Sequence, residues 1–240
     1  MRLLILILLF VSLQSQGQVI NASAPYRARA AAATAGITLL AQTSKASPTG
    51  ASVTTDAINT TGASLIVVCI VSVYYNSQPI QDNQSNTWSL AGEVPSGSSY
   101  VRVQIYYKYS PTTNSSHTFS TVGGYGVNYA SMIVFAFSGT TGTAFDTNNY
   151  TQVGASPLST GSITPSTNGQ VLIALLGSHN TSSVSSVTSG FSEYNVASSA
   201  NNFFACAAYY VQPTAASKEC TFTWTSSPAW NGTALIASFK

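Results

Sequence analysis

The chain has 240 residues, enough to bury one sizeable hydrophobic core, and β-sandwiches of this length commonly form a single domain. Charged residues make up only 6% of it, so Ser, Thr, Asn and Gly supply most of the polar surface. Such a composition is common in secreted and virion surface proteins and unusual in a cytosolic enzyme. The net charge of +2 comes without a cluster of basic residues, which argues against a nucleic-acid partner.

The N-terminus has the pattern of a secretory leader. A positive start at Arg2 precedes an apolar run over residues 3–13, and small residues follow up to Gly17, so that Gln18 would be the mature start. The run is short for a bilayer span, which favours a cleaved signal over a retained hydrophobic anchor. We therefore expect a signal peptide over residues 1–17 and no membrane span after its cleavage. The protein would be secreted or held at the cell surface, with a virion surface as the alternative.

Residues 18–50 differ in composition from the rest of the chain. Residues 28–35 are nearly all alanine, which favours helix, but the run is too short to be stable alone in water. A short strand is predicted over residues 37–42. We interpret the region as an arm or linker that leads into an edge strand. The alternative is an arm that completes the sheet of a neighbouring subunit by strand addition.

From residue 51 onward the pattern predicts only β-strands. The stretch 62–75 is almost continuously apolar, rich in β-branched residues and free of Pro, which indicates a strand buried on both faces. Residues 100–109 alternate apolar and polar side chains, which predicts a strand with one wet face. Further strands are predicted at 53–58, 87–93, 117–122, 131–137, 171–177, 191–196, 203–211, 220–225 and 234–239.

These strands form two series that match in order and kind. Corresponding strands lie about 105 residues apart, as the apolar stretches 62–75 and 168–177 illustrate. A duplicated half-sandwich would leave such an offset. We therefore predict an all-β, antiparallel β-sandwich over residues 51–240, jelly-roll-like and built from two pseudo-repeated four-stranded halves that contribute strands to both sheets. Within each half, the strands at 100–109 and 203–211 should form hairpins with the strands that follow them.

Several turn and core patterns are shared with a known module. They are the stretches 59–68, 82–88, 117–119 and 136–139, and above all Ser-Thr-Gly-Ser-Ile-Thr-Pro-Ser-Thr-Asn at 159–168. Together they resemble a β-sandwich module that recurs, mostly unnamed, in tailed-bacteriophage structural proteins and secreted bacterial surface proteins. The resemblance covers about residues 43–240, and such patterns identify a fold better than an activity. It implies a display or attachment module without established catalytic residues.

The three cysteines leave at least one thiol unpaired in an exported protein. Cys206 and Cys220 are equidistant from Pro213, where the second hairpin should turn, so they would lie opposite each other on paired strands. A disulfide and two small buried thiols explain this pair about equally well. Cys69 lies in the most apolar strand and is expected in the core.

The sequence offers few groups for catalysis. A Ser or Cys nucleophile needs a base, and the two histidines, His117 and His179, occur without a Gly-x-Ser-x-Gly elbow. Glycoside hydrolysis needs two carboxylates across a cleft, and the six acidic residues are scattered. We therefore expect no enzymatic activity and no catalytic residues, with a polysaccharide hydrolase or lyase as the least favoured interpretation. The acidic residues are Asp56, Asp82, Glu93, Asp146, Glu193 and Glu219.

The loop at 82–86 carries alternating oxygen side chains that suit Ca²⁺, with Asp82 and Asn86 as the weak candidate ligands. Only one of them is charged, and an Asx turn, in which the side chains bond their own backbone, explains them without a metal. We favour the turn, and the stretch 146–149 invites the same two interpretations. No cofactor is therefore expected, with Ca²⁺ as the alternative.

Aromatic residues give the only hint of a ligand surface. Tyrosines beside Asn and Ser are what sugar-binding faces use, and we take Tyr106, Tyr109, Tyr125 and Trp230 as candidate ligand-binding residues. The alternative is that neighbouring tyrosines simply divide between the core and the outer face. The sequence therefore predicts an exported, non-enzymatic structural or adhesive module that binds a glycan or a protein at a cell or virion surface. It would act as a homo-oligomer or within a larger assembly, and a lectin-like carbohydrate-binding domain is the alternative.

Overall fold

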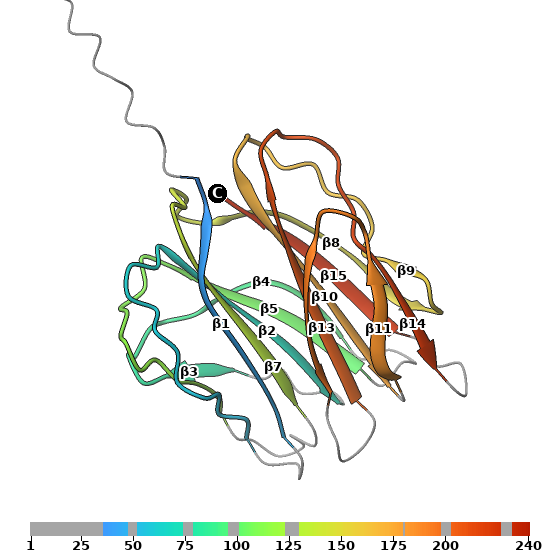
Figure 1. The fold of residues 1–240 in the computed structure, drawn as a ribbon, viewed down its shortest axis with the longest axis horizontal. Coiled ribbons are helices and arrows are strands. Elements are labelled where there is room, and N and C mark those ends of the chain that lie inside the picture. Colours follow the sequence, from blue (N-terminus) through green and yellow to red (C-terminus); the bar gives the residue numbers. More distant parts are fainter. Residues whose placement is uncertain are drawn as a thin grey trace, which may run out of the picture. The chain divides into compact units, whose positions relative to one another are not determined.

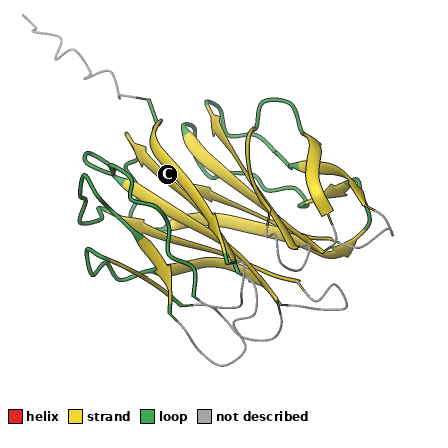
Figure 2. Cartoon of the chain, turned by 60° about the horizontal axis from the view of Figure 1, so that its bottom comes forward, coloured by secondary structure: helices red, strands yellow, loops and turns green. Residues whose placement is uncertain are grey.

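The protein is described by a computed structural model that covers residues 36–47, 52–73, 79–95, 101–122, 130–179, 181–197, 203–226 and 232–240. Within these ranges the chain forms fifteen strands and no helix, so the all-β prediction is confirmed (Figure 2). Nothing helical in them is suited to crossing a membrane. The predicted signal peptide and the Ala-rich part of the arm lie outside the described residues. The strands are β1 (Thr38–Ala46), β2 (Leu65–Val73), β3 (Ile80–Asp82), β4 (Ser89–Val94), β5 (Val101–Tyr109), β6 (Phe119–Thr121), β7 (Ser131–Ser138), β8 (Phe145–Gly154), β9 (Leu158–Ser159), β10 (Gln170–His179), β11 (Thr181–Val187), β12 (Ser192–Ala197), β13 (Phe203–Gln212), β14 (Thr221–Ser226) and β15 (Gly232–Phe239).

Two five-stranded antiparallel sheets dominate the fold (Figure 1). The first sheet has the order β1-β7-β2-β5-β4 and the second has the order β12-β13-β10-β15-β8. Each sheet therefore takes all its strands from one half of the chain. The expectation that each half contributes strands to both large sheets is wrong, and the jelly-roll topology, which requires that division, is not confirmed. The short strand predicted before residue 51 is present as β1, at the edge of the first sheet.

The two large sheets have the same strand order when β1, β2, β4, β5 and β7 are matched with β8, β10, β12, β13 and β15. Their registers agree as well. Phe137 on β7 pairs with Leu65 on β2, and Phe239 on β15 pairs with Val171 on β10. We call residues that this register places alike matching residues. The β-strand period of two then puts matching residues on corresponding faces of the two sheets.

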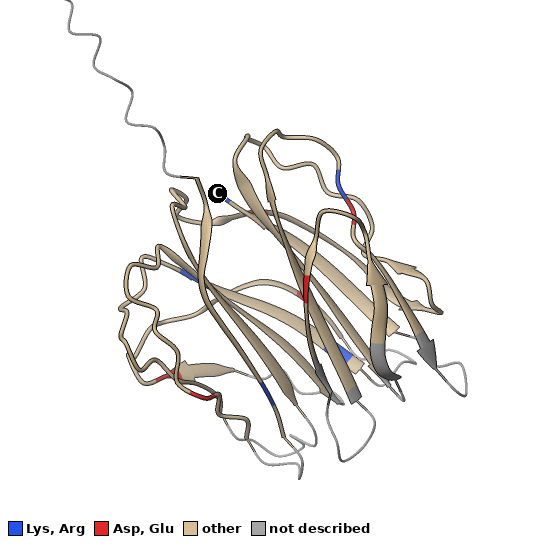
Figure 3. Ribbon diagram, viewed as in Figure 1, with Lys and Arg blue, Asp and Glu red and all other residues tan. Residues whose placement is uncertain are grey.

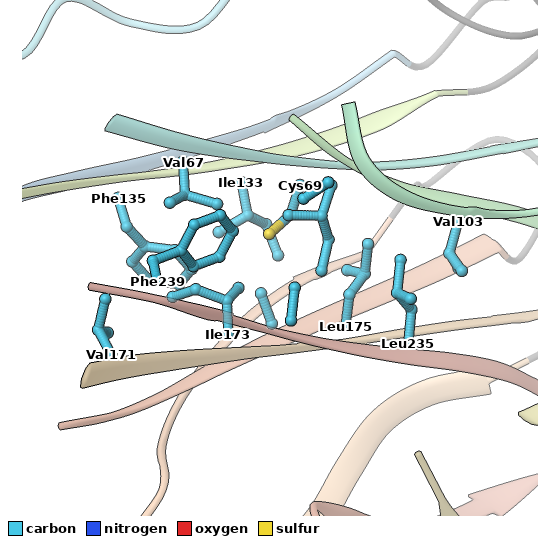
Figure 4. Close-up of a cluster of buried hydrophobic side chains, with 14 of the residues drawn as sticks. Val67, Cys69, Val103, Ile133, Phe135, Val171, Ile173, Leu175, Leu235 and Phe239 are labelled. Carbon is cyan, nitrogen blue, oxygen red and sulfur yellow. The ribbon is translucent and has the colours of Figure 1, made fainter. Parts of the chain in front are cut away.

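One hydrophobic core lies between the two large sheets (Figure 4). Val67 and Cys69 of the central strand β2 face it from one side, and Ile173 and Leu175 of the central strand β10 face it from the other. The alternate residues of both central strands are buried on the outer faces of the sheets. The prediction of a strand buried on both faces is therefore confirmed for residues 65–72.

Each outer face is covered by a small layer from the same half of the chain. The first cover layer consists of residues 52–60, β3 and β6, and the second consists of residues 155–165, β9, β11 and β14. Phe119 of β6 lies in the outer cluster of the first half, and Phe222 of β14 lies in that of the second. The cover layers bury sheet faces that would otherwise expose contiguous apolar surface.

The two hairpins expected from the sequence do not form. β6 pairs with β3 rather than β5, and β14 pairs with β11 and β9 rather than β13. The outer face of β5 is accordingly not wet, since Arg102, Gln104 and Tyr106 are all buried. The physical reason is that each large sheet has an apolar outer face, so the chain leaves the sheet after β5 and β13 to cover it.

Four strands were not predicted, namely β3, β8, β9 and β11. The longest of these, β8, is the edge strand of the second large sheet and includes the stretch 146–149 that was expected as a turn. Its side chains are mostly polar and partly exposed, so its sequence carries no strand-like alternation.

Candidate functional site

Because the strands run antiparallel, the connections between them lie at one end of the fold or at the other. At one end β2 finishes opposite the start of β5, and β10 finishes opposite the start of β13. The two sheets share this end, because a side chain at Gly177 near the end of β10 would contact Val71 and Val101 near the same end of the first sheet. Eight segments, four from each half, link strands across this end: 48–51, 74–78, 96–100, 123–129, 155–157, 180, 198–202 and 227–231. We call it the eight-connection end.

The eight segments share an unusual composition. They contain five of the thirteen tyrosines, together with Trp230, and no Asp, Glu, Lys or Arg. Asn, Ser and Gly supply most of the remaining positions. Seven of the eight segments lie outside the described residues, so their side chains are known here by sequence alone.

The four predicted ligand-binding residues divide between different places. Tyr125 and Trp230 belong to the eight segments and lie outside the described residues. Tyr106 is buried on the outer face of β5, where Gln104 Nε2 donates to its hydroxyl at 3.0 Å. Tyr109 is buried in the core between the sheets. Tyr106 and Tyr109 therefore cannot line one ligand surface, because strand alternation points them to opposite faces.

A buried polar cluster lies at the opposite end of the fold, centred on His117. Its Nδ1 is 2.9 Å from Thr60 Oγ1 and its Nε2 is 3.2 Å from Asp82 Oδ2. The ring stacks on Phe119 with a centroid distance of 4.3 Å. Neither the His117 nor the Asp82 side chain has exposed surface. Burial lowers the pKa of His117 below its ordinary value, and the contact with Asp82 opposes that shift.

The contacts of His117 indicate which nitrogen of the neutral ring carries the proton. A proton on Nε2 faces the Asp82 carboxylate, which leaves Nδ1 free to accept from the Thr60 hydroxyl. Thr60 is further bound to the backbone of Asn114, whose N–H lies 3.2 Å from Thr60 Oγ1. The cluster therefore joins three connections that are far apart in the sequence, those that contain Thr60, Asp82 and His117.

Asp82 also organises the turn that follows it. Its Oδ1 accepts from the backbone N–H groups of Gln84 and Asn86, at 3.0 and 2.9 Å, and its Oδ2 accepts from Asn86 Nδ2 at 2.8 Å. Asn86 Oδ1 accepts from the N–H of Thr112 at 2.8 Å. These bonds are the Asx-turn chemistry that the sequence favoured, and they engage the oxygens that a cation would need. No group of three or more His, Cys, Asp and Glu side chains in the described ranges is placed to hold a metal.

Thr60, His117 and Asp82 follow the order of a nucleophile, a base and an acid. Thr60 is fully buried, however, and its Oγ1 accepts from the backbone N–H of Asn114. A substrate therefore has no route to that oxygen, and the arrangement serves to hold connections together. Sequence reasoning missed this cluster, because no local signal relates His117 to a threonine 57 positions earlier.

All six acidic residues lie in the described part of the chain, and each contacts a different group. Charged side chains are few and spread over several elements (Figure 3). This distribution leaves each carboxylate with its own partner rather than with a second carboxylate. The contacts are Asp56 with Lys45, Asp82 with His117, Glu93 with Arg102, Asp146 with Lys240, Glu193 with Asn195, and Glu219 with Ser159 and Ser162.

Asp146 has the most strongly perturbed carboxyl group. Its Oδ2 accepts from the N–H of Ser166 at 2.6 Å and from Gln170 Nε2 at 2.9 Å, and Lys240 Nζ lies 3.5 Å from its Oδ1. Desolvation raises the pKa of Asp146, but these hydrogen bonds and the lysine charge outweigh it and lower the pKa to about 2. Asp146 therefore fixes the C-terminal residue and the start of β10 to the edge strand β8.

The three cysteines are all free and buried. Cys206 lies on β13 of the second large sheet and Cys220 precedes β14 of the second cover layer, so the expected cross-strand geometry is wrong. Both belong to the outer cluster of the second half. Burial raises the pKa of Cys220 to about 12 and that of Cys69 still further, so these thiols are protonated and unreactive at neutral pH.

Comparisons of the sequence and the fold with protein-family models, curated proteins and solved structures find no match.

Proposed function

We propose that this protein is an exported, non-enzymatic β-sandwich that serves as a structural or adhesive module on a bacterial surface or a virion, and that it attaches through the eight-connection end. The observation that carries the proposal is topological. Strand ends from both halves, between which the eight connections run, lie at the same end of one core. Binding residues are commonly held on segments that a rigid scaffold positions.

The composition of the eight segments supports the same proposal. Tyr and Trp supply large contact areas with few rotatable bonds, while Ser, Gly and Asn supply adaptable hydrogen bonds. No segment carries an acidic or basic residue. The partner is therefore a neutral surface, either a glycan or an uncharged protein patch. Binding should then depend only weakly on salt, because no charge pairs would be screened.

We infer further that the two halves arose as a duplication of one unit, a large sheet with its cover layer. The identical strand order and the shared register support this inference. Two matching units would place two similar sets of connections side by side, which suits repeated display. The leader pattern and the resemblance to modules of phage and bacterial surface proteins support the exported location.

A binding experiment tests the proposed function. The chain from Gln18 onward is labelled and applied to a glycan array and to intact bacteria, at roughly 50 and 500 mM salt, which spans strong changes in screening. Trp230→Ala and Tyr125→Ala should each reduce binding at both salt concentrations. Tyr150→Ala is the matched control, since Tyr150 is an exposed aromatic on the edge strand β8.

The outcomes separate the alternatives. If Trp230→Ala and Tyr125→Ala lose binding to defined sugars on the array, the lectin-like form of the proposal is supported. Binding to cells that survives both end substitutions, or that is lost only with Tyr150→Ala, overturns attachment through this end. Shortening of a polysaccharide by the purified protein overturns the non-enzymatic assignment. Light scattering of the same preparation shows whether the module is a monomer or a defined oligomer.

A further inference from the structure

The two cover layers are fastened at matching places by different residues. In the first half, Ile58 and His117 form an isolated antiparallel bridge in which each donates its N–H to the other's carbonyl. In the second half, Ile163 and Lys218 form the same bridge. One bridge thus contains a histidine, and the other contains a lysine in its place.

We propose that His117 is an acid-sensitive latch, which fastens the segment 52–60 to the rest of the first cover layer at neutral pH and releases it in mild acid. The matching bridge of the second cover layer contains Lys218 in its place. Release would expose the part of the outer apolar cluster that Val53 and Ile58 cover, while the core between the large sheets stays closed.

The geometry around His117 accepts the neutral ring and disfavours the protonated one. Protonation places a second N–H on Nδ1, and the Thr60 hydroxyl must then turn from the ring to the Asn114 carbonyl, 3.2 Å away, in order to accept it. It also places a charge in a position without exposed surface, which is costly unless the charge is fully paired. Asp82 is the partner on offer, but the approach of His117 Nε2 to its Oδ2, at 3.2 Å, does not have the geometry of a hydrogen bond.

The other described charged groups near the latch do not offset the charge of a protonated His117 ring. Of the described charged groups, Asp82 is the one that contacts the His117 ring. Asp56 lies on the segment that carries Ile58, but it pairs with Lys45, and both side chains are largely exposed. The lowered pKa of His117 agrees with this account, since the folded state then binds a proton less readily than the open state does.

Release is expected to be local because the segment 52–60 is joined to β6 at separate points. Besides the latch, these points include the pair between Thr55 and Phe119, the bond from Thr121 N–H to the Val53 carbonyl, and the bridge between Thr54 and Ser120. Phe119 stacks directly on His117, so movement of the ring disturbs the main apolar anchor of the layer. The latch and this anchor therefore move as one unit.

Amide hydrogen exchange at pH 7.5 and 5.5, corrected for intrinsic rates, tests the latch. Because the histidine of the open state has a pKa of about 6.5, protonation should raise the opening constant of the first cover layer about tenfold between these pH values. The amides of Ile58 and His117 report on the latch. The matching amides of Ile163 and Lys218 form the internal control and should not change.

Variants decide whether His117 is the cause. His117→Gln cannot titrate, so the tenfold change should disappear, whereas His179→Gln removes the other histidine and should leave it intact. If His117→Gln fails to fold, an NMR titration of the unaltered protein keeps the test decisive. A His117 ring that titrates at or above 6.5, or an equal acid response in both cover layers, overturns the proposal.

Discussion

The two halves of the chain build the same framework and then differ in the side chains that fasten it. Thr55 in the first half and Thr160 in the second each donate the backbone N–H to the residue opposite and accept that residue's N–H through Oγ1. The residues opposite are Phe119 and Cys220, a large ring and a small thiol. The backbone pairing is therefore retained where the packing is not.

The fastening of the cover layers shows the sharper difference. His117 is neutral and closed off in the first half, whereas Lys218 in the second half places its Nζ 4.9 Å from the centroid of the Tyr210 ring. The comparison shows that the two central strands, which are apolar on both faces, keep the same pairing register in both halves. The residues that fasten the cover layers, His117 and Lys218, lie outside these strands and differ in chemistry.

The largest expected effects come from matching core residues. Ile66 and Leu172 are both fully buried on the outer faces of the central strands. Truncation to Ala should cost each half about 2–5 kcal/mol of unfolding free energy, through lost transfer energy and an unfilled cavity. Urea denaturation of the two single variants measures this. A loss near zero in one half would show that the halves do not carry equivalent cores.

Substitution of Gly177 tests the contact between the two halves, which meet there at matching positions. Its matching residue is Val71, and a Cβ at Gly177 would lie 2.8 Å from Val71 Cγ1 and 2.5 Å from Val101 Cγ1. Valine methyls are held by stiff χ1 rotamers, so Gly177→Ala should overpack the core and destabilise the fold by about 1–3 kcal/mol. Gly36→Ala is the control, because no atom lies within 4 Å of a Cβ placed there. In a double-mutant cycle, Val71→Ala should recover part of the loss. Purely additive losses would contradict the contact.

The sequence predicts the central strands well because their own side chains specify them. Residues 65–71 are apolar on both faces, and that pattern fits no exposed element. The edge strand β8 and the cover strand β11 escape prediction because much of their sequence is polar. Their strand form comes from hydrogen bonding to β15 and β14, which a local pattern cannot reveal.

In the candidate site, too, local features could be predicted from the sequence and long-range contacts could not. The turn after Asp82 is predictable, since an Asx side chain bonds backbone groups within four residues. The contact between His117 and Thr60 is not, because it depends on how the first cover layer folds back over the sheet. The cysteine geometry failed for a related reason: Cys206 lies on β13 of the second large sheet, whereas Cys220 precedes β14 of the second cover layer, and the division between sheet and cover layer depends on which apolar face remains to be covered.

Acid should act on the two halves in separate pH windows. The pKa of Asp146 is lowered to about 2, so its contribution is present above its ordinary pKa near 3.8 and is lost as the pH falls from there toward 2. Loss of up to about 2 kcal/mol is expected in that window. Asp146→Asn should remove the window and leave the response near pH 6 unchanged. Stability measured by urea from pH 7 to 2 checks this, and one combined transition that responds to this substitution at pH 6 would contradict separate windows.

The smallest expected effect comes from the lysine that takes the place of the latch. Lys218 lies over Tyr210 and, at 5.8 Å, over Phe191, and a cation above an aromatic face at a partly exposed site contributes about 0.5–1 kcal/mol. Lys218→Met keeps the aliphatic cover of the rings and should cost that amount at both pH 7.5 and 5.5. Lys45→Met, which breaks an exposed ion pair, serves as the control and should change stability by less than about 0.5 kcal/mol. A pH-dependent cost at Lys218 would show that the second cover layer titrates as well, and the contrast between the two halves would then lie in packing alone.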